Sequence, residues 1–182
     1  TKLQRDLAYS LKLQHRGPQV YLRGLIEISN RCRKNCLYCG IRAGNSQVCR
    51  YEMSDEQVLR EAQFALDAGY GSIAIQGGER SDIAFIERIT RLLYQIRRLQ
   101  PGGSSGANTN NLGITLSLGE QSREVYREWK NAGASRYLLR IEASNRELYE
   151  KIHPGFALTS SAQETAHNTQ QPMPERGTAC SE

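Results

Sequence analysis

The chain has 182 residues, of which 38% are hydrophobic and 24% charged, and its net charge is +5. This composition supports a packed core and excludes a wholly disordered chain. No apolar stretch approaches the roughly 20 residues that span a bilayer. The basic excess contains no run of Lys and Arg, so it falls short of a nucleic-acid-binding signature. We therefore expect neither a membrane nor a nucleic acid among the partners.

Five cysteines are present, and three of them lie within eight residues, from Cys32 to Cys39. An odd number in this clustered pattern favours metal binding over a disulfide framework. The first 13 residues mix charged and apolar side chains and lack the continuous apolar stretch of a signal peptide. Together these features predict a cytoplasmic protein in a reducing compartment.

Short apolar runs alternate with amphipathic segments as far as about residue 155. The runs predict strands over residues 20–28, 72–76, 112–118 and 136–142. Ser54 with Gln57 forms a capping box for the first following helix, which Gly69 ends. The next helix is predicted to begin at Ser81 and to end near residue 99. Two more follow, one containing Trp129 and closed by a glycine at 133, and one capped by Ser144.

Four strand–helix units in series predict parallel strands joined by right-handed crossovers. A doubly wound sheet and a barrel both satisfy this pattern. A complete eight-unit barrel needs about 200 residues or more. We therefore expect an α/β fold in which residues 1–155 form about half of a TIM-type barrel, with open strand edges.

Residues 156–182 depart from this pattern and are rich in Thr, Ser, Gln, Ala and Pro. Two interpretations remain open. The segment is either a native disordered tail or a segment outside the fold that arose from a frame shift, splicing or truncation. The second predicts a partial gene product whose activity in isolation is doubtful.

The strongest chemical signal is Cys32-x3-Cys36-x2-Cys39, directly after the first predicted strand. Three such thiolates converge on one centre only from a loop. Zinc would need a fourth ligand, from Cys49 or His153. A disulfide with a spare thiol is a second option. The third is an iron–sulfur cluster, which three ligands would leave with one iron open, whereas electron-carrier clusters take four cysteines.

This motif, with the aromatic Tyr38 before its third cysteine, resembles the signature of radical S-adenosylmethionine (SAM) enzymes. The resemblance implies a partial barrel that carries a 4Fe-4S cluster on the loop after the first strand. It also implies that SAM binds the open iron. A reducing electron donor of the flavodoxin or ferredoxin type then drives cleavage of SAM to a 5′-deoxyadenosyl radical, which abstracts hydrogen from a small-molecule substrate.

Within this superfamily, the amino-acid sequence is most similar to the HydE-type maturases of FeFe hydrogenase. The similar segments are RGLIEISNRCRKNCLYCGIR (23–42), GYGSIAIQGGE (69–79), ITLSLGE (114–120) and SRYLLRIEASNRELYEKIHP (135–154). Biotin synthase and methylornithine synthase are the nearest alternative assignments within the superfamily. The maturase interpretation implies other hydrogenase maturation proteins as partners. A non-catalytic zinc-binding module is the alternative from a different functional class.

The resemblance also assigns roles to residues at the strand ends. Gly77, Gly78 and Glu79 match the motif whose backbone meets the amino group of SAM, because glycines allow close backbone approach. Tyr38 would place its backbone beside adenine. Ser117 would lie near SAM.

Pairs of polar residues two positions apart share one face of a strand. Thr115 and Ser117 form one such pair, and Arg140 and Glu142 form another at the expected end of the fourth strand. Arg suits the carboxylate of SAM, and Glu suits its hydroxyl or amino groups. By resemblance, Gln76 and Thr115 border the substrate cavity and are the candidate catalytic residues.

Overall fold

Four parallel strands run through the chain in a computed structural model that describes residues 1–102 and 112–154. They form one sheet in the order β1-β2-β3-β4. Their bounds are β1 Arg23–Ser29, β2 Ser72–Gly77, β3 Gly113–Ser117 and β4 Arg136–Tyr137. The predicted tail, 156–182, lies outside the described residues.

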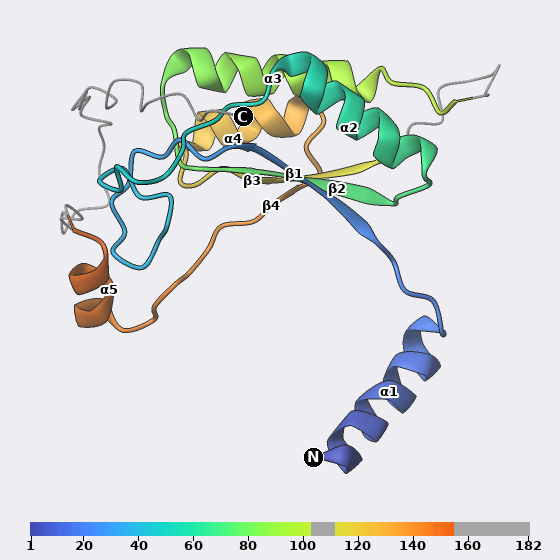
Figure 1. Ribbon diagram of the computed structural model, residues 1–182. Helices are drawn as coiled ribbons and strands as arrows, with labels where there is room; N and C mark the ends of the chain where they lie inside the picture. The colour runs from blue at the N-terminus through green and yellow to red at the C-terminus, as the bar shows by residue number, and fades with distance from the viewer. Residues whose placement is uncertain (103–111, 155–182) are drawn as a thin grey trace.

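A helix follows each strand, as the sequence predicts. These helices are α2 Asp55–Asp67, α3 Ile83–Arg97, α4 Arg123–Asn131 and α5 Arg146–Ile152. Helices α2, α3 and α4 cover the same face of the sheet (Figure 1). Four βα units with sequential parallel strands are the architecture of a partial TIM-type barrel, and the predicted α/β class is confirmed.

The core lies between the sheet and these three helices. Alternate strand residues point into it, which explains the period of two along each strand. On β2 these are Ile73 and Ile75, and on β3 they are Ile114 and Leu116, all at most 1% exposed. Trp129 of α4 is the largest fully buried side chain. The opposite face of the sheet therefore carries the other set of alternating residues, including Gln76 and Thr115.

Helix α2 begins where the sequence predicts. Ser54 accepts a hydrogen bond from the Gln57 backbone, and the Gln57 side chain accepts one from the Ser54 backbone, which completes the capping box. After the helix, Gly69 takes a left-handed conformation with φ 70°. The helix buries Val58, Ala62 and Ala65 against the sheet.

Several predicted boundaries need correction. The first strand begins at Arg23 and not at residue 20. Helix α3 begins at Ile83 and not at Ser81, because the Asp82 carboxylate accepts from the Phe85 backbone and caps the helix there. Helix α5 is capped by Asn145 in place of Ser144. Strand β4 stops at Tyr137, five residues before the predicted end at 142, because its partner β3 ends at Ser117 and offers pairing to residues 136 and 137.

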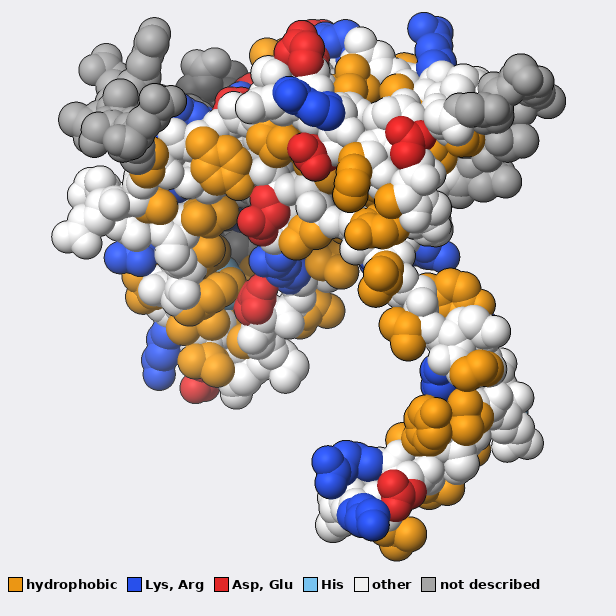
Figure 2. All heavy atoms as spheres, turned by 45° about the vertical axis from the view of Figure 1, so that its right-hand side comes forward, with side chains coloured by type: hydrophobic (Ala, Val, Ile, Leu, Met, Phe, Trp, Pro, Cys, Tyr) orange, Lys and Arg blue, Asp and Glu red, His pale blue; other side chains and the backbone are white. Residues whose placement is uncertain are grey.

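Helix α1, Lys2–Arg16, precedes the first strand and was not predicted. It projects away from the sheet (Figure 1) and buries none of its residues. Hydrophobic side chains remain exposed along it (Figure 2), among them Leu3, Leu7 and Leu11. Within residues 1–102 and 112–154, no helix combines the length and apolar character needed to cross a bilayer.

Candidate functional site

Loops from three neighbouring strands meet at the carboxyl edge of the sheet. The cysteine loop, residues 30–51, follows β1. The glycine turn, residues 77–79, begins at the last residue of β2, and the segment 118–121 follows β3. Because parallel strands end at the same edge, motifs far apart in the sequence come together there.

The glycine turn packs directly against the cysteine loop. A Cβ atom at Gly78 would lie 2.2 Å from the carbonyl oxygen of Arg31 and 2.6 Å from the Cβ of Cys32. The first of these neighbours is backbone and cannot rotate away. Glycine at 78 is therefore required by a close approach of two backbones. The sequence interpretation gave this glycine a different reason, the approach of SAM, and that expectation stays a prediction.

Hydrogen bonds fix Cys32 to this turn. The backbone N–H of Glu79 donates to Cys32 Sγ across 3.3 Å, and the backbone N–H of Arg33 donates to the Glu79 carbonyl across 2.9 Å. Burial raises the pKa of the Cys32 thiol, although the backbone N–H groups that face the sulfur oppose that shift.

The Glu79 side chain joins all three loops. Its Oε1 accepts from Arg33 at 2.9 Å and lies 3.4 Å from Lys34 Nζ, and its Oε2 accepts from the Glu120 backbone at 3.0 Å. Because this carboxylate is buried, its negative charge needs compensation, and two cations and a backbone amide provide it. Gly119 makes room for it, since its φ is +79° and a Cβ there would lie 2.3 Å from Glu79 Cγ.

The segment between Cys36 and Cys39 rests against the end of α5. Leu37 N–H donates to the Ile152 carbonyl at 2.9 Å, and the Tyr38 hydroxyl lies 2.9 Å from His153 Nε2. Burial raises the pKa of the Tyr38 hydroxyl, and nearby Cys36 raises it further. The predicted cofactor residue Tyr38 is thus placed beside the cysteines and held from α5.

Arg50 is a residue of the site that sequence reasoning missed. Its guanidinium donates to four backbone carbonyls of the cysteine loop, those of Asn30, Ile41, Arg42 and Asn45. A lone arginine after a cysteine motif carries no periodic signal, so no sequence pattern selects it.

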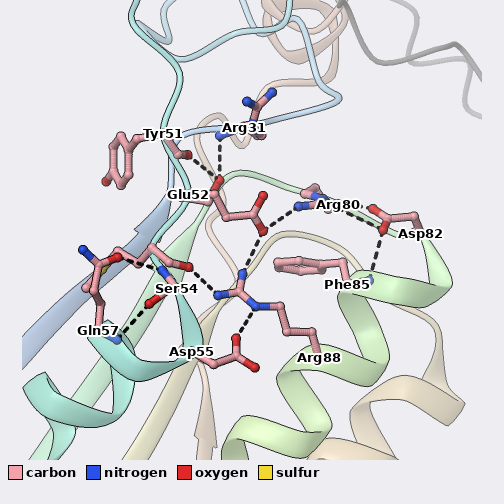
Figure 3. A network of polar contacts seen from close by, with 12 residues as sticks. Arg31, Tyr51, Glu52, Ser54, Asp55, Gln57, Arg80, Asp82, Phe85 and Arg88 are labelled. Carbon is pink, nitrogen blue, oxygen red and sulfur yellow. Dashed lines mark hydrogen bonds and ion pairs between the residues drawn. The ribbon is translucent and has the colours of Figure 1, made fainter. Parts of the chain in front are cut away.

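A second polar network braces the glycine turn from the helix side (Figure 3). Arg80, next to Glu79, pairs with Asp82 at 2.9 Å and with Glu52 at 2.9 Å. Glu52 also pairs with Arg88 of α3 at 2.7 Å. These contacts tie the turn to the beginnings of α2 and α3.

The candidate substrate residues lie on the sheet face opposite the helices. Gln76 accepts from Arg140 at 2.7 Å and donates to Glu27 at 2.9 Å. Gln76 pairs in register with Ser117. Thr115 lies mid-strand, two residues before the end of β3 at Ser117, and its hydroxyl is buried with no hydrogen-bond partner among the described residues.

Arg140 and Glu142 were expected to end the fourth strand, and this is wrong because β4 stops at Tyr137. Both lie on the segment between β4 and α5. Arg140 still reaches the sheet through Gln76, whereas Glu142 is exposed. The structure therefore brings Arg140 to the sheet edge without strand pairing.

The donor set can be tested for its fit to a metal group. In the two described stretches, no three His, Cys, Asp or Glu side chains gather closely enough to enclose one metal ion. A structural zinc site takes four ligands, whereas this loop supplies three free cysteines. Three cysteines on one loop, of which Cys32 packs against Gly78, fit the ligand set of a cluster with an open iron.

Comparison with known proteins adds independent evidence. The family model described as "Radical SAM superfamily" matches residues 26–160. The chain belongs to the radical SAM superfamily. Its members include enzymes such as the FeFe hydrogenase maturase subunit HydE of Thermotoga maritima, to which this chain is 38% identical over 148 residues. That stretch is 81% of this chain and 39% of HydE.

Other relatives cover a similar part of the chain. The 3-methylornithine synthase of Methanosarcina acetivorans is 25% identical over 82% of this chain and 40% of its own length. The crystal structure of HydG, a maturase of the FeFe hydrogenase, superposes with a TM-score of 0.67 at 26% identity and covers 82% of this chain and 32% of HydG. This radical SAM chain thus spans about 40% of the length of the curated relatives it matches.

Proposed function

We propose that this chain carries the cluster-binding half of a radical SAM enzyme that acts in maturation of the FeFe hydrogenase active site. Cys32, Cys36 and Cys39 would hold a 4Fe-4S cluster. When bound, the cluster and SAM supply one-electron cleavage of SAM to a 5′-deoxyadenosyl radical. The observation that carries the proposal is the backbone contact between Gly78 and the Arg31–Cys32 segment.

The contact matters because it puts the two sequence motifs at one place. Cys32 is a proposed iron ligand, and the glycine turn is the proposed site for the amino group of SAM. A side chain at 78 would push the turn away from the cysteine loop. The buried Glu79 then fixes the turn and the loop relative to each other through Arg33 and Lys34.

The remaining residues would bind and orient. Arg140 supplies a cation for the carboxylate of SAM, and Ser117 and Glu142 supply polar groups for its amino and hydroxyl groups. Tyr38 would offer its backbone to adenine. Gln76 and Thr115 would face a small-molecule substrate, and the Thr115 hydroxyl, which has no partner within residues 1–102 and 112–154, is available to hydrogen-bond it.

The maturase role is the finer part of the proposal. It is supported by 38% identity to HydE, compared with 25% to 3-methylornithine synthase over nearly the same stretch. A biotin synthase-like or methylornithine synthase-like reaction uses the same cofactors on a different substrate. Partners would be an electron donor of the flavodoxin or ferredoxin type and other maturation proteins.

Anaerobic reconstitution with iron and sulfide, followed by electron paramagnetic resonance (EPR) of the reduced protein with and without SAM, tests the proposal. We expect a 4Fe-4S signal that changes when SAM is added. The Cys36→Ser variant should lose it, and the Cys180→Ser variant, outside the motif, should keep it. A wild-type chain that takes up zinc and no iron–sulfur cluster would contradict the proposal and support the zinc-module alternative.

A further inference from the structure

Arg50 lies near the end of the cysteine loop, and its guanidinium contacts the backbone of the loop at several points. Its Nη1 donates to two carbonyls at 2.7 and 2.8 Å, and its Nη2 donates to two more at 2.7 and 3.2 Å. All four carbonyls belong to the loop between β1 and α2. One guanidinium therefore ties four points of the loop together.

These points include both ends of the loop. Arg50 itself is next to the last loop residue, and Asn30, whose carbonyl it bonds, is the first. The buried Asn30 side chain closes the same gap, since it donates to the Cys49 carbonyl at 2.6 Å and accepts from the Tyr51 backbone at 2.8 Å. The loop is thus closed at its base by side-chain to backbone bonds.

The middle of the loop is also fixed. Arg50 bonds the carbonyls of Ile41 and Arg42, the second and third residues after Cys39. The backbone and side chain of Arg42 both donate to the Cys39 carbonyl at 3.3 Å. The position of Cys39 therefore depends on Arg50 through Arg42.

Cys32 is held independently of this arrangement. Its sulfur accepts from the backbone of Glu79, and Gly78 packs against its Cβ. Two of the three thiols are thus anchored to different parts of the molecule. Their mutual arrangement requires contacts that connect the part of the loop near Cys32 to the segment after Cys39. Arg50 makes such a connection with its side chain, beside the 2.8 Å backbone hydrogen bond from the Ala43 N–H to the Lys34 carbonyl.

We propose that Arg50 is a positioning residue that holds Cys39 in place relative to Cys32 before any cluster is loaded. This inference rests on the proposed function, because cluster binding is the reason for the three thiols to keep a fixed arrangement. Lysine cannot replace the arginine fully. An ammonium is a point charge, whereas the planar guanidinium offers five N–H donors in a fixed fork that reaches several carbonyls at once.

The first test uses the metal-free protein and measures alkylation of each cysteine by iodoacetamide, peptide by peptide. In the Arg50→Gln variant we expect alkylation of Cys39 to become about tenfold faster, since several charged hydrogen bonds are lost. Alkylation of Cys32 should stay at the wild-type rate. The Arg50→Lys variant should fall between the two.

The matched control is Arg91→Gln, which removes the same charge from an exposed side chain on α3. It should leave both alkylation rates unchanged. Equal acceleration at Cys32 and Cys39 in the Arg50→Gln variant, or no acceleration at Cys39, would overturn the inference. So would global unfolding of both Arg50 variants by circular dichroism, because the proposed role is local.

The second test reconstitutes the same variants with iron and sulfide. We expect the Arg50→Gln variant to retain several-fold less iron than wild type after gel filtration, with a broadened EPR signal. Equal iron retention and an unchanged signal would overturn the role of Arg50 even if wild type binds a cluster. Failure of wild type itself to bind a cluster would contradict the proposed function, while the alkylation result would still decide whether Arg50 positions Cys39.

Discussion

The backbone N–H of Glu79 donates a hydrogen bond to the sulfur of Cys32 across 3.3 Å, although the two residues are 47 positions apart. They meet because β1 and β2 are adjacent parallel strands, and each motif begins where its strand ends. The arrangement requires residues without a Cβ at Gly78 and at Gly119. A substitution to alanine, which adds one methyl group, tests each requirement.

The Gly78→Ala substitution should be severely disruptive. Its Cβ would lie 2.2 Å from the Arg31 carbonyl oxygen, so the turn and the cysteine loop must separate. We expect a loss of about 3 kcal/mol in the free energy of unfolding, the upper part of the range for overpacking. Urea unfolding followed by circular dichroism measures this, and iron content after reconstitution should fall as well.

Gly71→Ala is the matched control for that experiment. A Cβ at Gly71 meets nothing within 4 Å, and the residue has no left-handed backbone. The free energy of unfolding should therefore stay within about 1 kcal/mol of wild type. If the two alanine variants unfold at the same urea concentration, Gly78 is not held by the close contact that we describe.

At Gly119, both the backbone conformation and the neighbouring Glu79 side chain disfavour a side chain. Its φ is +79°, and a Cβ would lie 2.3 to 2.6 Å from atoms of the Glu79 side chain. Gly69 has a similar φ of +70° but open space around it. Gly69→Ala therefore measures backbone strain alone, about 1 to 2 kcal/mol.

We expect Gly119→Ala to cost about 1 to 3 kcal/mol more than Gly69→Ala, because it adds a clash with a buried carboxylate. Thermal and urea unfolding of both variants give the comparison. Adding Glu79→Ala to Gly119→Ala should recover part of that excess. Absence of any such coupling would show that Glu79 and Gly119 do not share this space in solution.

The fold was predictable because its signals are local and repeated. Ser54 and Gln57 mark a helix start, and the alternation around Ile73 and Ile75 marks a buried strand. Helix α1 was not predicted, although Thr1 and Gln4 form a capping box at its start. Strand β4 was too long in the prediction because a strand's length also depends on its neighbour.

The candidate site was predictable only in part, for a similar reason. Motif residues such as Cys32 and Gly78 are recognisable by spacing, and the parallel topology then brings them together. Arg50 and Gly119 act through contacts with residues far along the chain or with loop carbonyls. Such contacts have no period and no spacing, so the structure is needed to find them.

Acid should weaken the network that braces the glycine turn. Burial alone would raise the pKa of Asp82, but the hydrogen bond and charge of Arg80, with the Phe85 backbone N–H, lower it below the usual 3.8. A carboxyl with a lowered folded-state pKa stabilises the fold above its unfolded pKa, and this contribution is lost as pH falls through the folded pKa.

The Asp82→Asn variant tests this, because Asn also caps helices but has no charge to pair with Arg80. At pH 7 we expect it to be less stable than wild type by up to about 1 kcal/mol, as for a partly exposed ion pair. The difference should shrink as pH falls below about 4. Urea unfolding between pH 3 and 7 measures it, and a difference that stays constant would contradict the assignment.

Binding of SAM should depend on Arg140 if that residue receives the carboxylate. In the structure its guanidinium donates to Gln76 Oε1 at 2.7 Å, so it already points toward the sheet edge. Removal of a charge-assisted hydrogen bond costs about 1.5 to 3 kcal/mol. We therefore expect the Arg140→Gln variant to need about 10- to 100-fold more SAM to produce the EPR change.

Titration of the reduced, reconstituted protein with SAM supplies the measurement, and iron content reports whether the cluster itself is intact. Arg123→Gln, which removes the same charge at the exposed start of α4, is the matched control and should titrate like wild type. Full iron content with a shifted midpoint for the Arg140 variant alone supports a direct contact with SAM. An unshifted midpoint would assign Arg140 to the Gln76 hydrogen bond and leave the carboxylate of SAM to another cation.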